Sequence, residues 1–148
     1  MGKASRANKK RKHMLRDIEF EAHDPVTKDE YGFPSIISRA WLLYYQAIAS
    51  NPSGNVEETA KGVTVFNKLK VSSEAGSTEG TRRIKKDGTT LRLTNEELDY
   101  SKKAVSKIRD QVPISQGDAL MYLDQLFAGA KEIDESKLVA AAGPELVK

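Results

Sequence analysis

The sequence contains no cysteine and only two histidines among its 148 residues. The missing thiols exclude disulfide bonds, thiolate metal ligands and a cysteine nucleophile. His13 falls in a basic stretch and His23 in an acidic one, and no Gly-x-Ser-x-Gly elbow or glycine-rich phosphate loop accompanies them. We therefore expect a protein that binds a partner, is not an enzyme and uses no cofactor.

Long hydrophobic runs are also missing. The longest, residues 40–45, is far shorter than the ~20 apolar residues of a membrane-spanning helix. The basic N-terminus is not followed by the apolar segment that a secretory signal requires. We expect no membrane association and a cytoplasmic location.

Positive charge is concentrated at one end of the chain. Residues 1–16 contain seven Lys and Arg and no acid, whereas the whole chain carries +3, which leaves −4 for residues 17–148. A segment so poor in apolar side chains cannot offset its ordering entropy by burial. We predict a disordered basic arm (1–14), a single folded domain (15–132) and a polar, alanine-rich tail (133–148).

The domain is predicted to be mainly α, with α+β as the alternative. Apolar periodicity and capping residues indicate about four helices, near 36–50, 56–70, 95–112 and 116–131, with Ser35 as the N-cap of the first and Thr94 as that of the third. Within the first of these, Trp41 and Tyr44 are interpreted as core residues.

Two segments are ambiguous between helix and strand. Residues 15–23 alternate apolar and polar side chains, which favours a strand over a helix. Residues 56–71 fit either structure, and Asn55 as a cap with Glu57 and Glu58 favours a helix. The alternative is that residues 63–71 add a third strand to the hairpin predicted over residues 82–93, which would make the class α+β. Residues 72–80 are predicted to be a flexible linker.

A β-hairpin is predicted over residues 82–93. Asp87-Gly88 is a favoured central pair for a tight turn, because both residue types tolerate positive φ. The hairpin carries several cations, so it is the second basic element after the arm.

Nucleic acid is the partner that we narrowly favour, contacted through its phosphates with little sequence specificity. The candidate contact residues are Lys3, Arg6, Lys9, Lys10, Arg11 and Lys12 in the arm, and Arg82, Arg83, Lys85, Lys86 and Arg92 in the hairpin. Cations at such places also serve solubility and protect sheet edges from aggregation. Size, basic start and lack of catalytic motifs suit an accessory or assembly protein of a phage or bacterium.

The alternative function is a protein-interaction module, such as an assembly factor, adaptor or inhibitor. Residues 115–148 carry a charge of −3, and the helix at 116–131 has an apolar stripe that could dock a protein partner. The stripe consists of Leu120, Leu123, Leu126 and Phe127. The oligomeric state is open, and a homodimer is possible.

Carboxylates and a histidine would share one side of the strand near residues 17–23. Asp17, Glu19, Glu21 and His23 are ligand types that suit Mg²⁺ or Mn²⁺. Alternating acids on a strand are more often solvated charge, or pair with the chain's own cations. We therefore predict no metal site.

Overall fold

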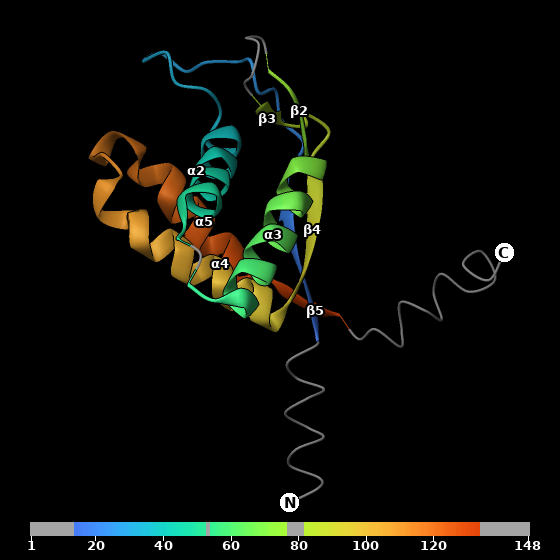
Figure 1. The fold of residues 1–148 in the computed structure, drawn as a ribbon. Helices are drawn as coiled ribbons and strands as arrows, with labels where there is room; N and C mark the ends of the chain where they lie inside the picture. Colours follow the sequence, from blue (N-terminus) through green and yellow to red (C-terminus); the bar gives the residue numbers. More distant parts are fainter. Residues whose placement is uncertain (1–13, 53, 77–81, 134–148) are drawn as a thin grey trace, which may run out of the picture.

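The computed structural model describes residues 14–52, 54–76 and 82–133, in which helices pack on one face of a small antiparallel sheet (Figure 1). The elements are β1 (Leu15–Phe20), α2 (Ile36–Ser50), α3 (Val56–Val71), β2 (Ser73–Ala75), β3 (Arg82–Ile84), β4 (Thr89–Thr94), α4 (Asn95–Ile108), the 3₁₀ turns η1 (Arg109–Gln111) and η2 (Ile114–Gln116), α5 (Gly117–Ala128) and β5 (Lys131–Ile133). The prediction of a mainly α protein with some β structure is confirmed. The predicted disordered arm up to residue 13 and the tail beyond Ile133 lie outside the described residues.

Helix α2 is the centre of the core. Ser35 caps its N-terminus by accepting a hydrogen bond from the Ser38 amide at 3.2 Å, as the sequence predicts. Trp41 and Tyr44 are almost fully buried. Their polar atoms are satisfied inside the core: the Trp41 indole donates to Ser72 Oγ at 3.0 Å, and the Tyr44 hydroxyl lies 2.6 Å from Ser101 Oγ. The core assignment of both aromatic residues is confirmed.

The main sheet has the order β4-β1-β5 and is antiparallel throughout. Leu15 is opposite Thr94 and Phe20 is opposite Thr89, so β1 and β4 pair along their whole lengths. Apolar side chains from both strands face the helices and are buried: Ile18, Phe20, Leu91 and Leu93. The strand interpretation of residues 15–20 is confirmed.

The predicted hairpin over residues 82–93 is wrong. A turn is present there, but its central residues are Lys86 and Asp87 instead of Asp87 and Gly88, and Asp87 does not have positive φ. Gly88 has φ +84°, and its amide donates to the Lys85 carbonyl at 3.3 Å. The two strands beside the turn nevertheless belong to different sheets, because β3 pairs with β2 and β4 pairs with β1. Non-local burial decides this pairing: β1 brings Ile18 and Phe20 to the same apolar face as the leucines of β4.

Other boundaries also differ from the predictions. Residues 73–75, assigned to a linker, form β2, and residues 131–133, assigned to the end of the last helix and the start of the tail, form β5. Asn55 caps α3 as expected, so residues 63–71 are helical and do not add a strand. In the described part of the chain, no helix is long and apolar enough to cross a membrane.

Candidate functional site

Three of the five cations predicted for the hairpin share one exposed region. We call Arg82, Lys85 and Lys86 the basic turn. All three residues are exposed, and none of their side chains lies within ion-pair distance of an acid among the described residues. Arg82 Nε donates to the neutral Ser73 Oγ at 3.0 Å. At longer range than an ion pair, the charge of Lys86 adds to the hydrogen bonds that lower the pKa of the Asp24 carboxyl.

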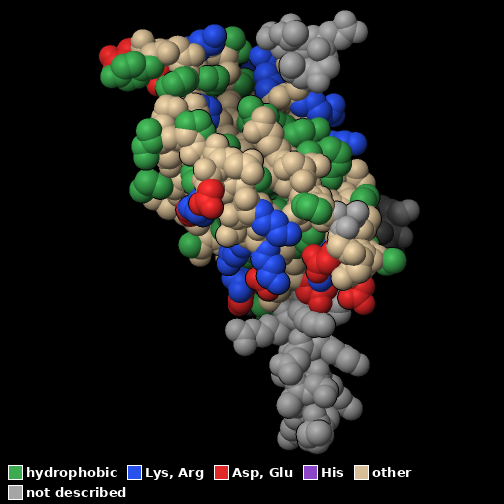
Figure 2. All heavy atoms as spheres, turned by 60° about the vertical axis from the view of Figure 1, so that its left-hand side comes forward, with side chains coloured by type: hydrophobic (Ala, Val, Ile, Leu, Met, Phe, Trp, Pro, Cys, Tyr) green, Lys and Arg blue, Asp and Glu red, His purple; other side chains and the backbone are tan. Residues whose placement is uncertain are grey.

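The backbone holds the basic turn in place. The Lys85 amide donates to the Ser72 carbonyl at 3.2 Å, which ties the turn to the C-terminal end of α3. The Lys86 carbonyl accepts from the His23 amide at 2.7 Å, which ties it to the segment after β1. In Figure 2, blue side chains gather at the top of the molecule, the end at which Figure 1 places β2 and β3. The exposed cations therefore project from a fixed backbone.

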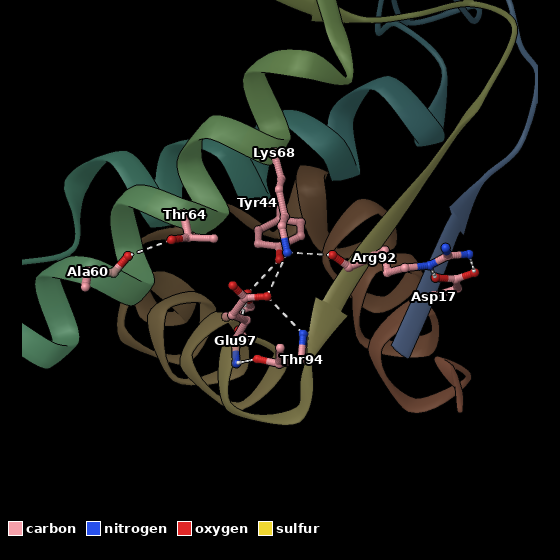
Figure 3. Close-up of polar contacts among 9 residues, drawn as sticks. Asp17, Tyr44, Ala60, Thr64, Lys68, Arg92, Thr94 and Glu97 are labelled. Carbon is pink, nitrogen blue, oxygen red and sulfur yellow. Dashed lines mark hydrogen bonds and ion pairs between the residues drawn. The ribbon is translucent and has the colours of Figure 1, made fainter. Parts of the chain in front are cut away.

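Arg92 and Arg83 are engaged by acids instead. The Arg92 guanidinium donates to both carboxylate oxygens of Asp17, at 2.8 and 3.0 Å, across the β1–β4 pair (Figure 3). This hydrogen bonding raises the pKa of Arg92, and the Asp17 side chain is only 10% exposed. Arg83 Nε lies 3.2 Å from Glu74 Oε1 across β2 and β3. Both arginines thus stabilise strand pairs.

Helix α3 contributes a second pair of lysines that the sequence interpretation left out. Lys68 Nζ donates to Glu97 Oε1 and to the Arg92 carbonyl, both at 2.8 Å (Figure 3). Lys70 Nζ lies over the Phe66 ring, 4.6 Å from its centroid. Basic side chains in the last turn also complement the helix dipole. A signal for them was available, because both lysines fall on polar positions of a predicted helix.

A groove of about 460 Å³ lies between α3 and β4. Its lining consists of Thr64, Asn67, Lys68, Val71, Ser72, Thr89, Thr90, Leu91 and Arg92. Several of these donors are already used within the protein. The hydroxyls of Thr64 and Ser72 donate to backbone carbonyls, and Lys68 and Arg92 donate to acids.

Met14, where the described chain starts, and the basic turn lie at opposite ends of the β1–β4 pair. The Met14 carbonyl accepts from the Asn95 amide at 3.1 Å, so the described chain starts beside the end of β4. The basic turn precedes the other end of β4, about 17 Å away along a six-residue strand. The arm residues proposed to bind nucleic acid, Lys3, Arg6, Lys9, Lys10, Arg11 and Lys12, lie outside the described residues.

The apolar stripe of the last helix is used by the protein's own core. Leu120, Leu123 and Phe127 are buried, and Leu126 is partly buried against them. Phe127 packs edge-on against Tyr44, with 5.1 Å between the ring centroids. The docking surface predicted on this helix is therefore corrected: these residues hold α5 against α2.

The acidic stretch near β1 shows no arrangement of metal ligands. Asp17 is bound to Arg92, and His23 Nε2 lies 3.0 Å from Ser38 Oγ. Asp24 accepts from the Thr27 hydroxyl and the Val26 amide, and these bonds lower the pKa of its carboxyl. Within residues 14–52, 54–76 and 82–133 no three potential metal ligands cluster.

No protein-family model, curated protein or solved structure matches this chain. The function is therefore argued from the arrangement of the residues themselves.

Proposed function

We propose that the protein is a non-catalytic binding protein that contacts nucleic-acid phosphates through the basic turn. The observation that supports this is the contrast within one small region: Arg82, Lys85 and Lys86 form no ion pair within the described residues, whereas Arg83 and Arg92 do. Exposed cations on a fixed backbone can meet phosphates without a large ordering cost.

The neighbouring side chains extend this surface. Lys70 lies two residues before Ser72, whose carbonyl anchors Lys85, and the groove between α3 and β4 carries Thr and Asn side chains. Cations and short polar groups of this kind bind the sugar-phosphate backbone and position a protein on it. We therefore propose binding that depends strongly on salt and weakly on sequence, with the arm as a second point of attachment.

Matched pairs of adjacent lysines provide the test. The double variant Lys85→Ala/Lys86→Ala removes two charges from the basic turn, and Lys102→Ala/Lys103→Ala removes two exposed charges from α4. Fluorescence anisotropy with labelled duplex and single-stranded oligonucleotides, titrated over a range of salt, gives the affinity and its salt slope. We expect the basic-turn variant to bind about tenfold more weakly, with a slope smaller by about two.

The control separates a site from a general effect of charge. If both double variants lose affinity equally, the basic turn is not the site of contact. If the unmodified protein does not bind either oligonucleotide at low salt, the proposal of nucleic-acid binding is wrong.

A further inference from the structure

A second groove, with largely apolar walls, lies on a different side of the molecule. It has a volume of about 450 Å³ and runs between α2 and the segment that joins α4 to α5. Its lining consists of Pro34, Arg39, Leu42, Leu43, Gln46, Ser50, Ile108, Gln111, Val112, Pro113 and Gln116. From Arg39 to Ser50 the α2 wall spans about 16 Å, at the rise of an α-helix.

This groove has no net charge to attract an ionic partner. Arg39 is its single charged lining residue, and Asp118 neutralises it through hydrogen bonds of 2.6 and 2.8 Å. The other polar groups in the lining are amides and one hydroxyl. An occupant of matching chemistry is therefore apolar and uncharged.

The chain itself presents such an occupant beside the groove. Ile114 in η2 is 98% exposed, which is the highest value among the large hydrophobic residues that the structure describes. It does not line its own groove; a Cβ placed on Gly117 would lie 3.9 Å from its Cδ1. Residues 111–117 contain no charged side chain. An uncharged apolar knob thus stands next to an uncharged apolar groove.

We propose that this face binds a second copy of the chain, with Ile114 of each copy seated in the groove of the other. A two-fold symmetric contact requires that the knob and the groove belong to one face, since each copy must offer both. Neutrality fits the same requirement, because a surface that meets its own copy must not repel itself. The basic turn would repel its copy, whereas this face does not.

The proposed dimer face is separate from the basic turn. On α2, Tyr45 faces α3 and stacks on Phe66, with 5.1 Å between the ring centroids. Leu42 and Gln46 project to another side of the same helix and line the groove. A dimer formed here leaves both basic turns exposed, so the contact does not depend on the proposed nucleic-acid binding.

The apolar area extends beyond the groove. Within the groove Leu42 is 42% exposed; outside it Met121 is 63% exposed and lies one helical turn from Gly117, over which Ile114 lies. Figure 2 brings forward the side of the molecule on which Figure 1 shows the α4–α5 connection. Most charged side chains in that view lie at the top and in the lower part, with hydrophobic and uncharged groups between them. A stable interface needs about 800 Å² from each partner, so these flanking side chains have to contribute.

Sedimentation equilibrium of the full chain tests the proposal. We expect the mass to rise from the 16.4 kDa monomer toward twice that value between about 1 and 100 µM. Ile114→Asp should weaken the dimer about a hundredfold or more, because both knobs carry the change. Val56→Asp is the matched control: Val56 is 85% exposed at the start of α3, away from the face, and its variant should dimerise normally.

Cysteine cross-linking tests the placement of the knob, since the natural chain has no cysteine. Ile114→Cys mixed with Gln46→Cys should form disulfide-linked dimers faster than either variant alone. A protein that is still monomeric at about 100 µM, the highest concentration in the sedimentation experiment, overturns the proposal. So does an Ile114→Asp variant that dimerises like the natural chain, or cross-linking no faster in the mixture than in the separate variants.

Discussion

Lys86 in the turn and Arg92 in β4 lie six residues apart in the sequence, and their charges have different surroundings. Arg92 holds Asp17 across two strands, at 2.8 and 3.0 Å, whereas Lys86 is exposed and forms no ion pair within the part of the chain that the structure describes. The same contrast separates Lys68, bound to Glu97, from Lys85. A count of basic residues merges these two groups, although one stabilises the fold and the other is open to a ligand.

The charged residues that are paired with acids or bases inside the fold connect four elements: α3, β4, α4 and β1. Lys68 on α3 reaches both the β4 backbone and Glu97 on α4, and Arg92 on β4 reaches Asp17 on β1 (Figure 3). Glu97 also completes the capping box of α4, because its carboxylate accepts from the Thr94 amide at 2.9 Å. Removing any of these charges leaves a partner without its counter-charge.

Glu97→Ala should have the largest effect on stability. It removes the Glu97 half of the capping box, which accepts from the Thr94 amide, and the counter-charge of Lys68; the Glu97 side chain is only 11% exposed. Because Lys68 can regain some water, we expect a loss of about 2 kcal/mol in the free energy of unfolding. Urea denaturation monitored by circular dichroism measures this change.

Asp99→Ala is the control for this prediction, since Asp99 is exposed on the same helix. Its effect should stay within about 0.5 kcal/mol. An equal effect of the two variants would mean that the ion pair and hydrogen bonds around Lys68 and Glu97 stabilise the protein no more than an exposed surface charge does. The contrast between paired and exposed charges would then not hold for stability.

Local signals in the sequence are sufficient to place most of the helices. Ser35, Asn55 and Thr94 each cap the helix that they were expected to cap, because a cap depends on residues within one turn. The pairing of strands could not be predicted in the same way. A turn forms at Lys86 and Asp87, yet the strands on either side of it do not pair with each other: β4 pairs with β1, far away in the sequence, and β3 pairs with the nearby β2.

The short strands carried too little information to be predicted. β2 and β5 have three residues each, and neither is long enough to show an alternating pattern. The candidate site suffered from the same limit: the sequence shows which residues are basic but not which have acids beside them. The apolar stripe of α5 predicted a surface but packs inside, because amphipathicity alone does not say what covers it.

A pair of single variants should separate stability from binding. Arg92→Ala leaves Asp17 without its partner and should cost about 1 kcal/mol in unfolding free energy, because Arg92 is partly exposed. Lys86→Ala should change stability by less than about 0.5 kcal/mol. In the anisotropy assay we expect the reverse order, with a loss of about threefold for Lys86→Ala and little change for Arg92→Ala. If Arg92→Ala weakens binding more than Lys86→Ala does, then the engaged arginine also contacts the ligand.

The smallest effect is expected at Asp118, whose side chain stays about half exposed in its ion pair with Arg39. Hydrogen bonds from Arg39 lower the pKa of the Asp118 carboxyl. A lowered pKa in the folded state means that the pair stabilises the protein above the unfolded value of about 3.9 and loses this contribution as the pH falls through the folded value. Asp118→Asn should therefore cost about 0.5 kcal/mol at pH 7, with the difference from the natural chain vanishing near pH 2. Urea denaturation at several pH values measures this, with Glu19→Gln, exposed on β1, as the control. A difference that persists at low pH would show that Asp118 acts through packing or its contact with the Ala119 amide, and not through its charge.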